Sequence, residues 1–182
     1  MRKVMYLMGT LSDSDVEWLA AHGQTRFVPR NTTVIQQGQA IEALSILLEG
    51  KLSVRRSDLN RDVASLYPGE VLGEISFVDG RPPSASVVSV QDSHLLVVSR
   101  EVLTTKLDCD DAFAARFYRG LAVFLADRLR TTTAHLGYGT ANLEQEREGE
   151  ALDDGSFEEI SLGARRFDGM LRRLRMADGS GR

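Results

Sequence analysis

The residues with the clearest chemistry in this sequence lie in one stretch, Pro68–Val88. It opens with a Pro-Gly turn, and Gly73 then precedes a short run whose apolar residues are spaced for a single helical turn. The first N–H groups of a helical turn have no backbone partner and carry partial positive charge, so they attract an anion. Ser76 and Ser84 add hydroxyl groups. Glu74 would lie beside that anion, which is favourable only if the ligand also offers it a hydroxyl group. An anion together with a hydroxyl group indicates a phosphorylated sugar.

The rest of the sequence indicates neither catalysis nor metal binding. Neither a second carboxylate nor a histidine accompanies Glu74, so general acid–base chemistry is not indicated. The three histidines, His22, His94 and His135, are scattered and lack the spacing of metal ligands. Cys109 has no histidine near it in the sequence and is predicted to be inert. We therefore expect no enzymatic activity, no bound metal and no cofactor other than a nucleotide-like ligand.

The composition is that of a globular chain with one main domain and appendages. Of the 182 residues, 42% are hydrophobic and 26% are charged, which is enough apolar material for one good core. A net charge of −4 and a pI near 5.4 do not favour binding to nucleic acid or to anionic membranes. The single cysteine excludes an internal disulfide and fits a reducing compartment. No stretch approaches the roughly 18 to 20 apolar residues of a membrane span, so we expect a cytoplasmic protein.

An antiparallel β structure is predicted between residues 25 and 98. Short apolar runs there are separated by turn residues about every eight to twelve positions, which is typical of a sandwich or barrel. No helix of useful length interrupts these runs, so a parallel βαβ sheet is not favoured. The expected strands lie near residues 25–28, 33–36, 44–48, 52–56, 63–67, 84–90 and 94–98, with a short apolar step at Val71-Leu72.

Helices are predicted on both sides of the β region. Residues 11–22 form a short helix with two overlapping capping pairs, which begin at Ser12 and Ser14. A longer helix spans about residues 110–135. At 1.5 Å per residue it would be roughly 35–40 Å long, more than a small barrel can cover, so we expect part of it to form a homodimer contact. Its apolar stripe repeats every fourth residue: Phe113, Phe117, Leu121, Leu125 and Leu129.

Two segments with opposite charge follow the domain of residues 1–136. Residues 137–163 are predicted to be an acidic linker, because residues 144–159 contain eight acidic residues and one arginine. Residues 164–182 form a basic tail, and the apolar spacing within residues 164–176 predicts an amphipathic helix. We expect this tail to dock on its own domain or on a protein partner rather than on a membrane.

In its motifs the chain resembles the cyclic nucleotide-binding domain shared by catabolite activator proteins, protein kinase A regulatory subunits and nucleotide-gated channels. The resemblance covers about residues 10–136, and several motifs in order are more specific than one glycine pattern. The motifs are Gly38, Leu47–Gly50, Pro68-Gly69, Leu72–Ser76 and Ser84–Val87. The family fold implies a mainly β chain: an eight-stranded antiparallel β-roll, or jelly roll, with a short N-terminal helix and a long C-terminal helix.

The resemblance assigns roles to four consecutive residues of the central stretch. Gly73, Ile75 and Ser76 correspond to positions whose backbone N–H groups hold the cyclic phosphate. Glu74 corresponds to the carboxylate that accepts a hydrogen bond from the ribose 2′-hydroxyl.

Five further residues correspond to ligand-binding positions in the family. Ser84 and Ala85 correspond to the hydroxyl and the backbone N–H group on the other side of the phosphate. On the long helix, Arg128, Thr132 and Thr133 resemble positions from which bacterial activators reach the base, in part from the partner subunit.

One family position is changed in a way that bears on affinity. The arginine that binds the phosphate corresponds to Pro83 here, and proline has neither an N–H group nor a side-chain donor. A charge-assisted hydrogen bond contributes about 1.5–3 kcal/mol, so its loss predicts binding about tenfold to hundredfold weaker, or more. Arg81 is the candidate replacement for the missing guanidinium.

Three functions are compatible with these residues. The first is a non-catalytic cytoplasmic sensor or adaptor, in which a cyclic nucleotide such as cyclic AMP or cyclic GMP, or a related phosphorylated ligand, moves the long helix. The second is a protein-interaction or structural module that kept the roll and lost the ligand. The third is a transcriptional regulator of the catabolite activator type. The residues after 136 contain no helix-turn-helix pattern, so no nucleic-acid partner is expected.

Overall fold

The computed structural model describes residues 7–57, 61–137 and 154–179 of the chain. Eight antiparallel strands form its centre, as the sequence predicted. They are β1 (Gln24–Val28), β2 (Thr33–Ile35), β3 (Ala43–Glu49), β4 (Leu52–Arg56), β5 (Arg61–Leu66), β6 (Val71–Leu72), β7 (Ser86–Ser89) and β8 (Ser93–Ser99).

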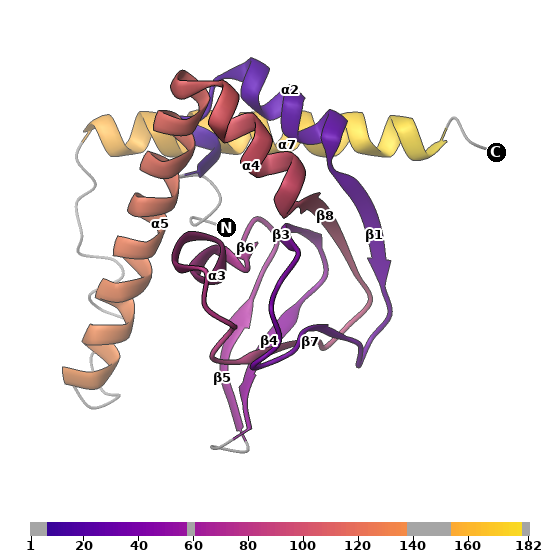
Figure 1. Cartoon of the computed structure of the whole chain (residues 1–182), viewed down its shortest axis with the longest axis vertical. Coiled ribbons are helices and arrows are strands. Elements are labelled where there is room, and N and C mark those ends of the chain that lie inside the picture. Colours follow the sequence, from indigo (N-terminus) through magenta and orange to yellow (C-terminus); the bar gives the residue numbers. More distant parts are fainter. Residues whose placement is uncertain (1–6, 58–60, 138–153, 180–182) are drawn as a thin grey trace.

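The strands form a β-roll of two four-stranded sheets (Figure 1). One sheet has the order β1-β8-β3-β6, and the other has the order β2-β7-β4-β5. Successive side chains of β3 point to opposite faces of its sheet. Leu44, Ile46 and Leu48 pack in the core beneath the helices, whereas Leu47 packs inside the roll. This sheet is therefore covered on both faces, which explains why the consecutive residues Ile46, Leu47 and Leu48 of β3 are all apolar.

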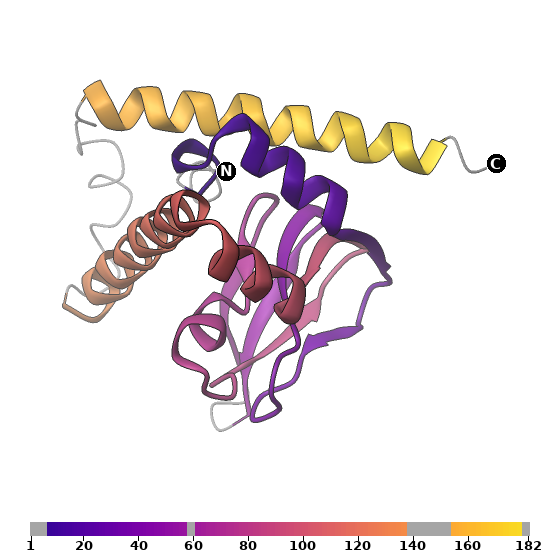
Figure 2. The ribbon, with the colours of Figure 1, turned by 45° about the horizontal axis from the view of Figure 1, so that its top comes forward.

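Helices cover the outer face of the sheet that contains β3. They are α2 (Asp13–His22), α3 (Glu74–Asp79), α4 (Arg100–Cys109), α5 (Asp111–Gly137) and α7 (Asp154–Gly179). Figure 2 shows α2 between the roll and α7, so that the N-terminal helix forms a middle layer. The same view shows α5 leading away from the roll along much of its length.

The N-terminal helix α2 is held at its start by a capping box. The Ser12 hydroxyl accepts from the Asp15 N–H group at 3.2 Å, and the Asp15 carboxylate accepts from the Ser12 N–H group at 2.7 Å. Asp15 also accepts two hydrogen bonds from Arg116 of α5, at 2.6 and 3.0 Å. Burial acts to raise the pKa of Asp15, but the hydrogen bonds from Arg116 and Ser12 outweigh it and lower the pKa. Of the two predicted caps, the structure therefore uses the one at Ser12.

The long helix α5 is buried at its start and exposed further along. Asp110 caps it by accepting from the Phe113 N–H group at 2.9 Å. Phe113 and Phe117 are fully buried, whereas Leu129 is 67% exposed. A four-residue spacing advances by about 40° per step around a helix of 3.6 residues per turn, so the predicted stripe rotates away from the core. The sequence was therefore wrong to place Leu129 on the same face as the buried aromatic residues.

The tail helix α7 packs on α2 of the same chain. Phe167 and Met170 are buried in the helical core, and Arg166 forms an ion pair with Asp13 at 2.6 Å. A further ion pair joins Arg175 to Glu49 of β3. The helix begins at Asp154, earlier than expected, so residues 154–163 of the predicted linker are helical.

Residues 138–153 of the predicted linker lie outside the described residues, as do 1–6 of the predicted domain and 180–182 of the predicted tail. Among the helices that are described, none combines the length and the apolar character needed to cross a membrane.

Candidate ligand-binding site

A tight backbone turn leads from β6 into the short helix α3. Gly73 caps α3 in the left-handed region, with φ of 84°. A Cβ atom at this position would also lie 2.7 Å from the Ile41 side chain and 3.3 Å from the Ala43 carbonyl oxygen. Both the backbone conformation and the available space therefore require glycine at Gly73.

The start of α3 presents free N–H groups. Its first backbone hydrogen bond runs from the Phe77 N–H group to the Gly73 carbonyl at 2.8 Å. The N–H groups of Ile75 and Ser76 therefore have no carbonyl partner within the helix, and the Glu74 N–H group donates to the carboxylate of its own residue. The Glu74 and Ser76 side chains are buried, whereas that of Ile75 is exposed.

Glu74 forms an ion pair with Arg128, which lies on α5. The Glu74 residue is 3% exposed, while the Arg128 side chain keeps partial access to solvent. Burial raises the pKa of the Glu74 carboxyl group, and the nearby guanidinium opposes part of that shift. The sequence assigned these residues to two different parts of a ligand. The structure shows that they also contact each other.

Thr132 and Thr133 follow Arg128 by about one helical turn. Both are exposed, and their hydroxyl groups donate to carbonyl oxygens of their own helix, those of Arg128 and Leu129, at 2.8 and 2.9 Å. In the single chain their described hydrogen bonds do not reach α3.

The loop after α3 carries the remaining predicted residues. Arg81 and Ser84 are exposed, and Ala85 packs beside the core inside the roll. The Arg81 N–H group donates to Asp79 at 2.9 Å. Pro83 uses its carbonyl oxygen to accept from the Gly38 N–H group at 2.9 Å. Ser84 and Ala85 precede β7, which begins two residues later than the predicted strand.

Arg100 is a structural residue of this site that the sequence did not single out. Its guanidinium donates to the Ser76 carbonyl at 3.2 and 3.3 Å and to the Phe77 carbonyl at 2.9 Å. It also lies 5.1 Å from the centre of the Phe77 ring. Because Arg100 is the first residue of α4, it joins the C-terminal end of α3 to the helix that leads into α5. The local sequence holds no signal for this contact, which spans 23 to 24 positions.

The arrangement offers groups that can bind a ligand. Within the described ranges, no group of three or more histidine, cysteine, aspartate or glutamate residues could hold a metal ion. What the site offers is two N–H groups without a carbonyl partner in the helix, a buried carboxylate and Arg128 of the long helix.

Comparison with known proteins agrees with this geometry. Residues 25–108 match the family model described as "Cyclic nucleotide-binding domain". The "Cyclic AMP receptor protein" of Thermus thermophilus is 33% identical over 129 residues, which are 69% of this chain and 58% of that protein. The "Pycsar effector protein XpPycTIR" of Xanthomonas perforans is 31% identical over 119 residues, 65% of this chain and 39% of that protein. The chain thus spans less than two thirds of either relative.

Solved structures show the same fold. The catabolite activator protein of Thermus thermophilus has a TM-score of 0.62 at 26% identity, and the match covers 95% of this chain and 88% of that one. A cyclic nucleotide-binding domain from Methylobacillus flagellatus has a TM-score of 0.67 at 23% identity, with coverage of 73% and 80%.

Proposed function

Through residues 25–108 the chain belongs to the cyclic nucleotide-binding domain family, and we propose that it is a non-catalytic, cytoplasmic sensor of a cyclic nucleotide. The observation that carries this proposal is the ion pair between Glu74 and Arg128. It connects the predicted ligand carboxylate directly to α5, the element that would transmit the signal.

The proposed ligand contacts follow from the chemistry of α3. The cyclic phosphate accepts from the backbone N–H groups of Gly73, Ile75 and Ser76, and the ribose 2′-hydroxyl donates to Glu74. Because Glu74 already accepts from Arg128, the hydroxyl shares or replaces that contact. The bound nucleotide thereby changes how firmly Arg128 holds α5, and we propose that Thr132 and Thr133 on the next turn contact the base.

The exposed part of α5 supports dimerisation as the second element of the mechanism. Tyr118 and Leu129 are both exposed, although large apolar side chains are usually buried. With the intervening Ala122 and Leu125 they repeat at spacings of four, three and four residues, the spacing of a two-helix seam. We propose that two copies pair along this stripe and that the nucleotide controls the geometry of the pair.

Calorimetry with nucleotides tests the proposed sensor function. We expect heat of binding from cyclic AMP or cyclic GMP, and no comparable heat from 5′-AMP, which carries an uncyclised phosphate. Affinity should be about tenfold to hundredfold below that of a site with the family arginine, so the titration needs high protein concentration. The 2′-deoxy analogue tests the assigned hydroxyl contact and should bind more weakly. Folded protein that releases no heat with these nucleotides or with cyclic dinucleotides would refute the sensor.

Pro83 favours a second candidate, a protein-interaction module that has lost its ligand. Its carbonyl oxygen is already used by the Gly38 N–H group, and Pro83 offers no donor to a phosphate. In this alternative the ion pair between Glu74 and Arg128 holds α5 in one position, and no ligand changes it. Replacing Pro83 with arginine separates the two candidates, because cyclic AMP binding that is found only in this variant would mark an abandoned site.

A further inference from the structure

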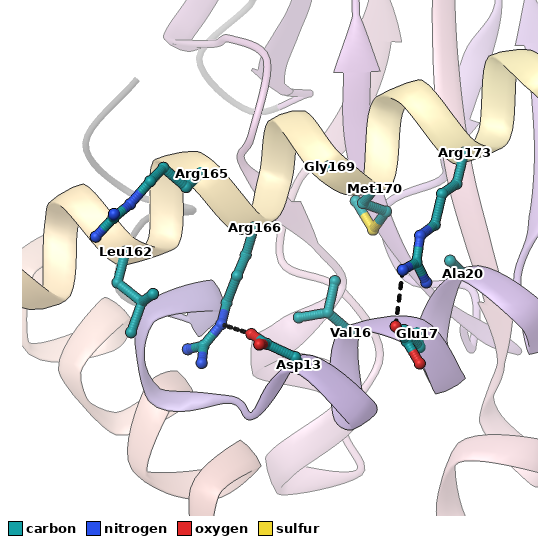
Figure 3. Close-up of a pocket in the computed structure, with 10 residues that line it drawn as sticks. All are labelled: Asp13, Val16, Glu17, Ala20, Leu162, Arg165, Arg166, Gly169, Met170 and Arg173. Atoms are coloured by element: carbon teal, nitrogen blue, oxygen red, sulfur yellow. Dashed lines mark hydrogen bonds and ion pairs between the residues drawn. The ribbon is translucent and has the colours of Figure 1, made fainter.

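A cavity of about 380 Å³ lies along the seam between α2 and α7 (Figure 3). It shares no lining residue with the α3 site. Its apolar lining comes from both helices and consists of Val16, Ala20, Leu162 and Met170. Small-molecule sites are commonly of roughly 300–1,000 Å³ and combine an apolar lining with a few charged groups, and this seam has both properties.

Gly169 keeps the cavity open. It lies inside α7, where glycine is a poorer helix former than alanine. A Cβ atom built there meets no atom within 4 Å, and the backbone is not in the left-handed region. Neither packing nor backbone conformation therefore requires glycine at this position. Its effect is to leave unfilled space between α7 and α2.

The charges around the cavity do not cancel. The lining contains three arginines and two carboxylates. Arg166 pairs with Asp13 at 2.6 Å and also donates to two backbone carbonyl oxygens, both at 3.2 Å. Arg173 pairs with Glu17 at 2.7 Å. Figure 3 shows these two pairs bridging the helices and Arg165 apart from them. Among the described residues Arg165 has no carboxylate partner, so one positive charge remains available.

We propose that this α2–α7 cavity binds a small molecule with an apolar body and a single anionic group. The apolar body lies against Val16, Leu162 and Met170, and the anionic group pairs with Arg165. Because such a ligand contacts both helices at once, its binding strengthens the docking of α7 on α2. The site is separate from the cyclic nucleotide site and does not depend on it.

Decanoate is a suitable probe, since it joins a flexible apolar chain to one carboxylate. We expect saturable binding of one decanoate per full-length chain by calorimetry, below the concentration at which decanoate forms micelles. Acetate, which lacks the apolar body, and decanol, which lacks the charge, should each bind at least about tenfold more weakly. A titration in which decanoate gives no saturable heat would overturn the proposal.

The substitution Gly169→Leu fills the cavity and should abolish decanoate binding. The leucine Cβ atom meets no other atom, and leucine has a higher helix propensity than glycine. The thermal unfolding temperature of the variant should therefore be unchanged or higher. Arg165→Gln should weaken decanoate binding about fivefold. The matched control is Arg172→Gln, an exposed arginine of α7 that does not line the cavity, and it should bind as the unmodified chain does. Undiminished binding by folded Gly169→Leu protein would show that decanoate binds elsewhere.

Discussion

The Arg128 guanidinium on α5 donates to the Glu74 carboxylate at the start of α3, across 54 positions of sequence. The carboxylate is buried, whereas the guanidinium is partly exposed. A ligand group that reaches Glu74 therefore acts on a residue that already holds the long helix. This contact makes a link between ligand binding and helix position physically direct.

Arg128→Gln should weaken the attachment of α5 to the roll. The substitution leaves the buried Glu74 carboxylate without its ionic partner, so the free energy of unfolding should fall by roughly 1–3 kcal/mol at pH 7. Urea denaturation measures this change. The matched control is Arg130→Gln, an exposed arginine on the same helix, which should change stability by less than about 0.5 kcal/mol. Equal losses in the two variants would contradict a specific role for the ion pair.

Glu74→Gln should change how stability depends on pH. Burial raises the pKa of Glu74, so the folded state binds this proton more tightly than the unfolded state does. Ionised Glu74 therefore destabilises the fold at neutral pH, and this cost is relieved as the pH falls through the raised pKa. Compared with Glu74→Gln, the unmodified chain should gain stability as the pH falls from 7 toward the ordinary glutamate pKa of 4.5. Denaturation of both proteins across this pH range measures the difference in their free energies of unfolding. A difference that changes in the opposite direction would mean that the charge of Arg128 outweighs burial and lowers the pKa of Glu74.

Pro83→Arg should increase the affinity for cyclic AMP. A guanidinium at the family position adds one or more charge-assisted hydrogen bonds to the phosphate, which corresponds to a gain of about tenfold to hundredfold. Calorimetry of both proteins measures the gain. Pro82→Arg adds the same charge at the exposed neighbouring position and should give little change. If both variants gain equally, the effect is general electrostatic attraction. If neither gains, the stretch does not bind cyclic AMP.

Leu129→Glu should disrupt the proposed dimer. The substitution places two carboxylates in the seam where two exposed leucines would meet, and like charges there repel. Sedimentation velocity should show a shift from dimer to monomer at micromolar concentration. Arg130→Glu places a carboxylate outside the stripe and should remain dimeric. An unmodified chain that is monomeric at every concentration would exclude this contact.

Much of the fold could be predicted because the signals are local. The strands followed from short apolar runs between turn residues, and four-residue motifs limited the helix cap to Ser12 or Ser14, of which the structure uses Ser12. The turn at Gly73 was recognisable because a left-handed residue before a helical turn favours glycine. The apolar stripe of α5 predicted its buried start correctly but not its end, because a four-residue repeat rotates away from the core along the helix.

The candidate site was predicted as a set of residues but not as a set of contacts. The sequence, with its family resemblance, identified Glu74 and Arg128, whereas Arg100 carried no local signal at all. For the tail, it predicted an amphipathic helix and left open whether the partner was its own domain or another protein. Amphipathic spacing shows that a helix has an apolar face, but it does not show what covers that face.

The sequence by itself determined the strands and the glycine turn that opens α3, because these depend on residues within a few positions of each other. Only the tertiary structure decided which charges meet. Arg128 reaches Glu74 across 54 positions, Arg116 reaches Asp15 across 101, and Arg166 reaches Asp13 across 153. The physical reason is that an ion pair depends on the distance between charges in space, and that distance is set by how the helices pack on the roll.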